Sequence, residues 1–379
     1  MKMQISKWSS NSIPLLRTIP KEELSPYEEV NKEDIDITFG DPDIISQGTK
    51  CLGMSWIPKK DVFNYSSYKG LSEIEEKSLK LTKRGISSLI PKIYDPTGLL
   101  QPFILKGKLI LQQTWVYKSS KGEPLGWDDK LPEEIKNQWL KWVMEIKEAA
   151  KFEVNRYLFK TLNNVPSRKK LSLHGFSDAG EKAWGVAIYI RYFNEETKLH
   201  ESHLIYSATR VAPTKVKLSI PRKELNGIVL LCEKLLYIAK SLDMNNDQVF
   251  AHTDSLVSMH WINKNKNNLK TYISNRVEKI QQSNIQILFT PGKQNPADLC
   301  SKPHPSKEYI NNTFWTTGPS YIQQGDDKFI EEYRMENVLK SKLPEEELEN
   351  FNIELKPITS ININAMNIQV KEPEGIYQV

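Results

Sequence analysis

The sequence predicts an α/β protein whose second half forms a five-stranded mixed sheet with helices on its faces. The expected strands are residues 171–178, 184–193, 202–213, 248–255 and 285–294. The first three are joined by short connections, which is typical of an antiparallel meander. The last two are preceded by helical segments, and strand–helix–strand units require right-handed crossovers and parallel pairing. A long amphipathic helix over 221–242 stands between the two groups.

Residues 71–165 are predicted to be mostly helical. Apolar residues recur there at spacings of three and four, and Pro91, Pro96 and Pro102 divide the pattern into separate helices. The segment 131–151 begins with a proline and two glutamates, which favour a helix start. Its apolar stripe, expected to pack in a core, is Ile135, Trp139, Trp142, Val143 and Ile146.

The two ends of the chain have a different character. Residues 44–70 hold two short β-like runs around Pro58–Asp61, which predicts a hairpin. The polar stretch 162–170 is interpreted as a domain boundary. Beyond about residue 305 the apolar rhythm is lost, and the acidic segment 343–351 is interpreted as a solvated helix or tail. The expected domains are 1–70, 71–165, 166–305 and 306–379.

Composition restricts the class of protein. The chain has 379 residues, of which 39% are hydrophobic and 26% charged, and this is ordinary for a globular protein of two or three domains. The net charge of +5 is compatible with a nucleic-acid partner. The three cysteines form neither a disulfide framework nor a zinc pattern. No run approaches the ~18 apolar residues of a membrane span, and the N-terminus does not resemble a signal peptide. An intracellular, cytoplasmic protein is therefore expected.

Four acidic residues occupy comparable places in the second half. Asp178 ends the first strand, Glu224 lies in the first turn of the long helix, and Asp254 ends the fourth strand. Asp298 follows the fifth strand in "NPAD", which looks like a helix start. The strands of Asp178 and Asp254 are expected to be parallel neighbours. Both carboxylates would then emerge at the edge where α/β sheets build their sites.

Such a cluster predicts bound cations. Four crowded carboxylates repel one another and become protonated unless divalent cations neutralise them. Hard oxygen ligands suit Mg²⁺ or Mn²⁺, and two such ions ~4 Å apart can activate a water and stabilise the leaving oxygen of a phosphodiester. Each residue taken alone is more simply a turn, cap or dipole-complementing residue. Four of them in this order favour a catalytic metal site.

The ordered set Asp–Glu–Asp–Asp resembles the ribonuclease H domain of retroelement reverse transcriptases. The segment "LFTPGKQNPADLCSK" (288–302) is similar to the last catalytic segment of that family. The resemblance is closest to the Bel/Pao group of retrotransposon polyproteins and extends over most of the chain. The further segments that carry it are "KWSSN" (7–11), "KCLGMSWIPKKDVF" (50–63), residues 82–115 with "YDPTGLLQP" at 94–102, "GWD" (126–128) and "FWTTGPSYI" (314–322).

The resemblance implies a ribonuclease H-like fold for 166–305 and cleavage of the RNA strand of RNA–DNA hybrids during reverse transcription. It implies that Asp178, Glu224, Asp254 and Asp298 hold two Mg²⁺ or Mn²⁺ ions. Residues 1–70 would be a truncated palm remnant with a hairpin near Leu52–Gly53. Residues 71–165 would form a thumb-like and connection-like region, and 306–379 a tail or linker.

Some features depart from the family pattern. No Tyr-Xaa-Asp-Asp motif occurs, so no polymerase activity is expected, and the palm and fingers of a full-length polyprotein become implied partners. A virus-like particle would be the setting of an active element. The region is also known as a Pao retrotransposon peptidase, but no Asp-Thr-Gly or Asp-Ser-Gly occurs, and Pro96 in "DPTG" forbids the required turn. Many ribonucleases H use a histidine near the last catalytic segment to aid product release. No clear counterpart occurs here, and His304, the nearest candidate, is interpreted as a surface residue.

Basic residues near these elements are candidates for phosphate contacts, because a hybrid-binding nuclease follows the backbone rather than the bases. They are Arg168, Lys169, Lys170, Arg210, Lys215, Lys217, Arg222, Lys223, Lys264 and Lys266. A solvated charged loop explains each cluster equally well. The small residues Ser177, Ala179, Gly180 and Thr253 would leave room for a sugar–phosphate backbone, or they are simply turn residues.

A second hypothesis is a retroelement relic or a nucleic-acid-binding scaffold without nuclease activity. The intact carboxylate set favours the enzyme, whereas the missing polymerase core favours the relic. Without the rest of the palm, apolar side chains such as Leu52, Met54 and Trp56 are expected to lie uncovered. Each large side chain left unburied would cost ~1.5–3 kcal/mol.

Overall fold

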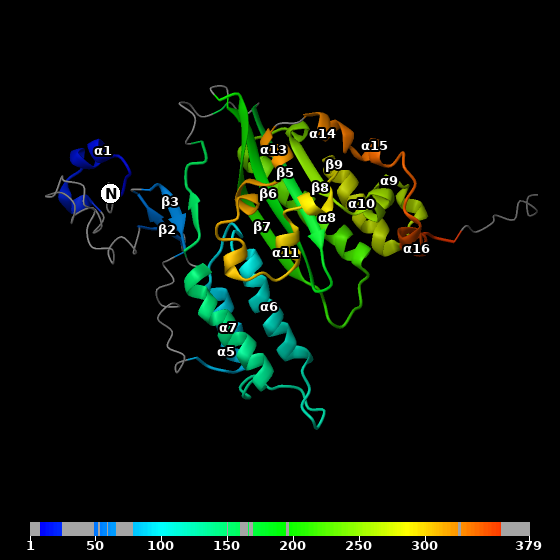
Figure 1. Cartoon of the computed structure of the whole chain (residues 1–379), viewed down its shortest axis with the longest axis horizontal. Coiled ribbons are helices and arrows are strands. Elements are labelled where there is room, and N and C mark those ends of the chain that lie inside the picture. The colour runs from blue at the N-terminus through cyan, green and yellow to red at the C-terminus, as the bar shows by residue number, and fades with distance from the viewer. Residues whose placement is uncertain are drawn as a thin grey trace, which may run out of the picture.

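The structure is a computed structural model of the chain (Figure 1). It describes residues 8–24, 49–51, 54–58, 60–65, 79–149, 151–159, 166, 170–194, 197–324 and 327–357. Leu52–Gly53, Arg168 and Lys169 lie outside these residues. The α-helices are α1 (Ile13–Thr18), α5 (Lys83–Leu89), α6 (Gln101–Val116), α7 (Glu133–Ala149), α8 (Ile220–Leu242), α9 (Leu256–Asn263), α10 (Thr271–Ser283), α11 (Asp298–Ser301), α12 (Thr313–Thr317), α13 (Ser320–Gln324), α14 (Asp327–Glu332), α15 (Met335–Val338) and α16 (Glu345–Ile353).

The central element is a five-stranded mixed sheet. Its strands are β5 (Leu171–Ala179), β6 (Ala183–Asn194), β7 (Leu199–Val211), β8 (Val249–Thr253) and β9 (Gln286–Phe289). Their order across the sheet is β7-β6-β5-β8-β9. The β5–β6 and β6–β7 pairs are antiparallel, and the β5–β8 and β8–β9 pairs are parallel. The predicted fold class, a meander continued by parallel strands, is confirmed.

Each face of the sheet packs against its own layer (Figure 1). On β5 and β6, Leu173, Val186 and Ile188 belong to a core shared with α8, α9 and α10. The alternate residues Phe176 and Tyr189 belong to a second core. This period of two follows from the pleat, which sends successive side chains to opposite faces. The near-continuous apolar sequence of β6 is therefore the signature of a strand buried on both sides.

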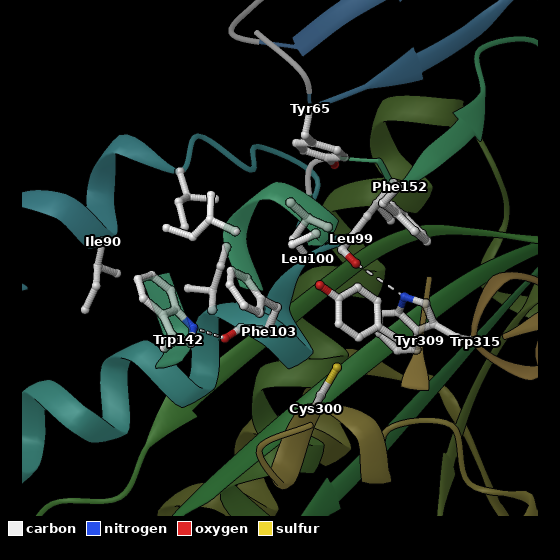
Figure 2. Close-up of a cluster of buried hydrophobic side chains, with 14 of the residues drawn as sticks. Tyr65, Ile90, Leu99, Leu100, Phe103, Trp142, Phe152, Cys300, Tyr309 and Trp315 are labelled. Atoms are coloured by element: carbon white, nitrogen blue, oxygen red, sulfur yellow. Dashed lines mark hydrogen bonds between the residues drawn. The ribbon is translucent and has the colours of Figure 1, made fainter. Parts of the chain in front are cut away.

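The second core joins the helical part of the chain to the sheet (Figure 2). Trp142 of α7 stacks on Phe103 of α6 with ring centroids 4.9 Å apart, and its Nε1 donates to the Phe103 carbonyl at 3.0 Å. Trp315 donates from Nε1 to the Leu99 carbonyl at 3.3 Å. The predicted apolar stripe of α7 is buried throughout, so its tryptophans are core residues.

Asp95 of "DPTG" has a structural role in this core. Its carboxylate accepts hydrogen bonds from the backbone N–H groups of Leu99 and Leu100, both at 2.9 Å, and from the Tyr65 hydroxyl at 3.1 Å. Gly98 has a φ of +79°, which suits glycine. The Thr97 carbonyl accepts from the Ser207 N–H of β7 at 2.9 Å. The turn therefore covers part of the sheet's edge strand.

A second, antiparallel sheet contains β1 (Thr49–Cys51), β2 (Met54–Ile57), β3 (Val62–Asn64) and β4 (Glu153–Asn155) in that order. The hairpin predicted around Pro58–Asp61 is confirmed, because Ile57 pairs with Val62. The exposure expected for Met54 is wrong: it is 8% exposed and lies in the core that contains Tyr65. Trp56 is half-buried and donates from Nε1 to Asp61 at 3.0 Å. The helical region and β4 supply the cover that a palm was expected to give.

The C-terminal segment packs more closely than the tail expected there. Tyr309, Trp315 and Ile322 are fully buried against the sheet. Residues 345–353 do form a helix, as predicted, but Phe351 of α16 enters the core beside α9. No helix in the described part of the chain is long and apolar enough to cross a membrane.

Candidate active site

Asp178 and Asp254 lie side by side at one end of the sheet. In the parallel pair β5–β8, Ser177 is the partner of Thr253, so the two aspartates are the next residues along each strand. Asp178 is the penultimate residue of β5, and Asp254 follows directly after β8. Both side chains are partly buried. The predicted juxtaposition at the carboxyl end of neighbouring parallel strands is present.

Glu224 reaches the same end from α8. The helix begins at Ile220, so Glu224 lies in its second turn rather than in the first turn expected. Gly227, one turn further on, lies against the end of β5: a Cβ there would be 3.5 Å from the Ser177 Cβ and 3.7 Å from the Asp178 carbonyl oxygen. Because residues three apart share a helix face, Glu224 is directed toward the same sheet end. Its Oε2 accepts from the Ser255 hydroxyl at 2.5 Å.

Asp298 is the first residue of α11, as "NPAD" predicted. The helix is held by Ala297 and Cys300, which are both fully buried in the core of Figure 2. Gly185 of β6 allows this packing, because a Cβ on it would lie 2.3 Å from the Cys300 Cβ. Gly185 is also the cross-strand partner of Asp178. Because Gly185 has no side chain, α11 can pack directly against β6 beside Asp178 of β5.

Asn295 ties this last segment to the strand ends. Its side-chain nitrogen donates to the Ser177 carbonyl at 2.9 Å, and its Oδ1 accepts from the Ala297 N–H at 3.1 Å. A hydrogen bond from Asn295 also lowers the pKa of Asp254, although burial raises it by more. Asn295 is 1% exposed, so these bonds are shielded from water.

The electrostatics of the site disfavour negative charge. Burial raises the pKa of Glu224 to about 7, and repulsion from Asp254 and Asp178 adds to this effect. Burial also raises the pKa of Asp254 to about 7, with further repulsion from Asp178 and Asp298. The pKa of Asp178 is raised by burial and by Asp298. Asp178, Glu224 and Asp254 therefore each experience the field of at least one other carboxylate, and Asp298 contributes to the field at Asp178 and Asp254.

Groups of the chain itself already bind these carboxylates. Ser301 donates to Oδ2 of Asp178, and Lys302 donates to Oδ1 of Asp298. Ser255 both donates to Glu224 and accepts from the Ser258 N–H at the start of α9. Among the residues that the structure describes, no group of three or more His, Cys, Asp or Glu side chains is arranged to hold a metal ion.

The donor set nevertheless fits a divalent cation in its chemistry. Carboxylate oxygens are the ligands that Mg²⁺ and Mn²⁺ prefer. A bound cation would also offset the cost of charging these buried carboxyl groups and the repulsion between them, which together raise the pKa values of Asp178, Glu224 and Asp254. The side-chain bonds from Ser301, Ser255 and Lys302 are the contacts that a bound ion would replace or reorganise.

The small neighbours and His304 have local roles. Ser177 and Thr253 are 1% and 2% exposed, so both are buried at the end of the sheet and are not open to a ligand. Ala179 and Gly180 are half-buried at the edge. His304 is not an open surface residue: its side chain is 18% exposed, and its Nδ1 lies 2.6 Å from Oε2 of Glu308.

The structure separates the basic residues proposed for phosphate contacts. Lys170 precedes β5 and so lies at the end of the sheet opposite Asp178. Arg222 makes a bidentate pair with Glu354 at 2.6 and 3.0 Å, and Lys223, 6% exposed, donates to the Glu181 carbonyl. These two cations serve internal bonds. The other candidates within the described residues are exposed or half-buried, and Lys266 pairs with Glu278: they are Lys170, Arg210, Lys215, Lys217, Lys264 and Lys266.

Sequence reasoning did not single out the residues that position the cluster: Ser255, Asn295, Ser301, Lys302 and Gly185. One signal was available, because Asp298 and Lys302 are four residues apart, the spacing of a helical ion pair. Gly185 and Ser301 act across strands and helices distant in sequence, and no local pattern marks them.

Residues 82–255 match the family described as Pao retrotransposon-like RNaseH-like domain. The match includes the helices α5 to α7, which precede the mixed sheet, and extends to Asp254 and Ser255. Asp298 lies beyond it. No curated protein matches the chain.

Solved structures with similarity to the chain include two ribonucleases H. The N-terminal RNase H domain of Rv2228c from Mycobacterium tuberculosis, fused to maltose-binding protein, is 6% identical with a TM-score of 0.24, over 37% of this chain and 94% of that one. LC11-RNase H1, isolated from compost by a metagenomic approach, is 18% identical with a TM-score of 0.24, over 34% and 90%. The foamy viral protease-reverse transcriptase in complex with dsDNA is 14% identical with a TM-score of 0.22, over 55% and 39%.

Proposed function

Because residues 82–255 match the Pao retrotransposon-like RNaseH-like family, we propose that the chain is the nuclease part of a retroelement polyprotein and hydrolyses the RNA strand of RNA–DNA hybrids. The observation that carries the proposal is the cluster of carboxylates at one sheet end. Three of them, Asp178, Glu224 and Asp254, have raised pKa values because they are buried and repel one another. Such an arrangement costs stability unless a cation compensates it.

In this proposal Asp178, Glu224, Asp254 and Asp298 hold two divalent cations. The cations would supply an activated water and neutralise the charge of the leaving oxygen. The protein's own part is to fix the ligands. Asn295 fastens the loop before α11 to the end of β5, and Cys300 anchors α11 against Gly185. Ser255 and Ser301 orient Glu224 and Asp178 before an ion enters.

The proposal extends to partners. Palm and fingers segments of a reverse transcriptase would deliver the hybrid, and an active element would place the protein in the cytoplasm within a virus-like particle. The hybrid backbone would contact exposed cations near the acidic end of the sheet, of which Arg210 is one.

An alternative function is a nucleic-acid-binding scaffold without nuclease activity. One observation favours it: Ser301, Ser255 and Lys302 already satisfy carboxylates of the site within the chain. A protein that has lost its metal could remain folded with these bonds in place.

Cleavage of a labelled RNA–DNA hybrid with Mg²⁺ distinguishes the two functions. We expect the parent chain to cut the RNA strand and Asp254→Asn to lose cleavage to background, because the amide removes a charged ligand from the centre of the cluster. Asp247→Asn is the matched control, since Asp247 is exposed and lies before β8 at the opposite end of that strand. Equal cleavage by parent and Asp254→Asn would indicate a contaminant. No cleavage by either would support the scaffold.

A further inference from the structure

Two exposed tryptophans lie together at the far end of the helical region. Trp115 in the last turn of α6 is 56% exposed, and Trp127 in the following loop is 43% exposed. Their rings meet edge to face, with centroids 5.2 Å apart. Large apolar side chains exposed in a cluster indicate an interaction surface. The catalytic proposal does not use this pair.

A buried cation holds the tryptophan pair in place. Lys83 is 5% exposed, and its Nζ lies 4.5 Å from the Trp115 ring centroid and 5.8 Å from that of Trp127. The same ammonium donates to the Leu125 carbonyl at 2.5 Å. Arg84 lies 5.6 Å from the Trp127 ring and pairs with Asp128. Lys83 and the edge-to-face contact with Trp127 fix the orientation of the Trp115 indole, and 56% of Trp115 remains exposed.

The surroundings are positively charged. Four further lysines of the neighbouring segments are exposed: Lys80, Lys118, Lys121 and Lys130. The acidic residues of the same segments are Glu123, Asp128 and Asp129. Asp128 is paired with Arg84, and Asp129 accepts from the Gly126 N–H at 2.6 Å. Within residues 79–89 and 115–130, which carry the two rings and the cations beside them, basic residues outnumber acidic ones, and this favours a polyanionic partner.

The pair lies on the side of the molecule that carries the acidic cluster. Gln101 at the start of α6 bonds Thr209 of β7 at 3.0 Å, and Thr209 is in register with Gly185 and hence with Asp178. Gln112 donates to the Ala212 carbonyl, just past the end of β7, at 2.6 Å. The helix thus advances beyond the sheet edge near Asp178, and Trp115 follows Gln112 by about one turn.

We infer that Trp115 and Trp127 form a stacking platform for an unpaired segment of RNA or DNA. Bases stack on exposed aromatic rings whatever their sequence, and the surrounding lysines would contact the phosphates. The platform adds a second nucleic-acid site to the proposed nuclease. A strand leaving the hybrid at the acidic end of the sheet would reach it as a single strand.

Binding measured by fluorescence anisotropy in EDTA tests the platform without requiring cleavage. The probes are a blunt RNA–DNA hybrid and the same hybrid with a ten-nucleotide unpaired extension, placed on either strand. We expect Trp115→Ala to weaken binding of an extended probe about tenfold while leaving the blunt probe unchanged. Trp115→Phe should keep most of the affinity, because a ring remains. Tyr237→Ala is the matched control, since Tyr237 is an aromatic residue 72% exposed on α8. Thermal unfolding checks that each variant is folded.

Three results would overturn the platform: equal affinity of the parent for both kinds of probe, equal losses on both probes, or no loss with Trp115→Ala. These outcomes are independent of the nuclease proposal. A chain that binds the extension through Trp115 but never cuts the hybrid supports the platform and refutes the nuclease. A chain that cuts the hybrid but binds both kinds of probe equally supports the nuclease and refutes the platform.

Discussion

His174 and His252 lie on the adjacent strands β5 and β8, and both are fully buried. His174 Nδ1 is 3.1 Å from His252 Nε2, and the Tyr321 hydroxyl is 2.9 Å from His252 Nδ1. His252 stacks on Phe176 at 4.4 Å between centroids. Burial lowers the pKa of His252 to about 3, and burial together with repulsion from His252 lowers that of His174 well below its usual value. Both rings are therefore neutral in the folded protein.

This pair predicts a pH-dependent stability. An unfolded histidine takes up a proton near pH 6.5, whereas the folded pair resists protonation, so the unfolded state binds more protons below that pH. The contribution of His252 is fully present above pH 6.5 and is lost as the pH falls toward 3, at about 1.4 kcal/mol per pH unit, and His174 acts in the same direction. Urea unfolding between pH 7.5 and 4.5 measures the slope. Glu224 and Asp254, whose pKa values burial raises to about 7, act in the opposite direction over the same range, so the comparison is between the two proteins. As the pH is lowered from 6.5 to 4.5, the double variant His174→Phe, His252→Phe should lose less stability than the parent or gain more. Equal slopes in the two proteins would assign the effect to other groups.

At the scale of elements, the position of α11 depends on close packing against β6. The two contacts that matter are Cys300 on Gly185 and Asn295 on the end of β5. A four-residue helix has little stability of its own. The position of α11, and therefore that of Asp298, is set by its contacts with β5 and β6.

Gly185→Ala should displace α11. The new Cβ would lie 2.3 Å from the Cys300 Cβ, so the helix or the strand must move. Overpacking of this kind costs about 1–3 kcal/mol of unfolding free energy, and we expect hybrid cleavage to fall with it. Gly227→Ala is the matched control: its Cβ would make an ordinary contact at 3.5 Å, and alanine favours a helix interior by roughly 0.5–1 kcal/mol. Urea midpoints and cleavage rates of the two variants, each compared with the parent, test this role of Gly185. Equal effects of the two substitutions would contradict this role of Gly185.

At the scale of the whole molecule, the sheet and the helical region share one core. Phe176 and Tyr189 of the sheet belong to the same buried cluster as Phe103 of α6 and Trp315 of the C-terminal segment. Figure 2 shows the part of this cluster that contains Phe103 and Trp315. On the other face, Phe351 of α16 and the Arg222–Glu354 pair fasten the end of the described chain to the helices beside the sheet. The division into four domains predicted from the sequence stays a prediction. Because the predicted domains share a core, removing some of them tests whether 166–305 can fold alone.

We expect residues 166–305 alone to be much less stable than the full chain. Trimming to this segment uncovers one face of the sheet, including Phe176 and Tyr189, and each large side chain exposed costs about 1.5–3 kcal/mol. Urea unfolding should show a lower midpoint or a broad transition. A chain ending at residue 357 is the control, because it keeps the shared core. An isolated 166–305 that unfolds cooperatively at the parent's midpoint would show that the segment is an independent domain.

Much of the fold was predictable because its signals are local. The strand-like apolar runs within 171–213, the amphipathic pattern of α8 and the stripe of α7 predicted the elements, and the short connections predicted the strand order. The packing of Met54 and of residues 309–322 was not predictable, because their apolar residues lack a clear period. Their burial depends on partners distant in sequence, such as Leu99 for Trp315.

The sequence by itself determined the mixed sheet, the order of its elements and the placement of Asp178 and Asp254 at its carboxyl end, since strand direction follows from the connections between elements. Only the tertiary structure decided what surrounds those carboxylates. Burial raises the pKa of Glu224 and of Asp254 to about 7, and repulsion between carboxylates adds to this effect, while Ser255 binds Glu224 and Ser301 binds Asp178 from other segments. Only the tertiary structure also placed Trp115 and Trp127 together over Lys83. These are contacts between residues far apart in the chain, and no pattern along a single segment specifies them.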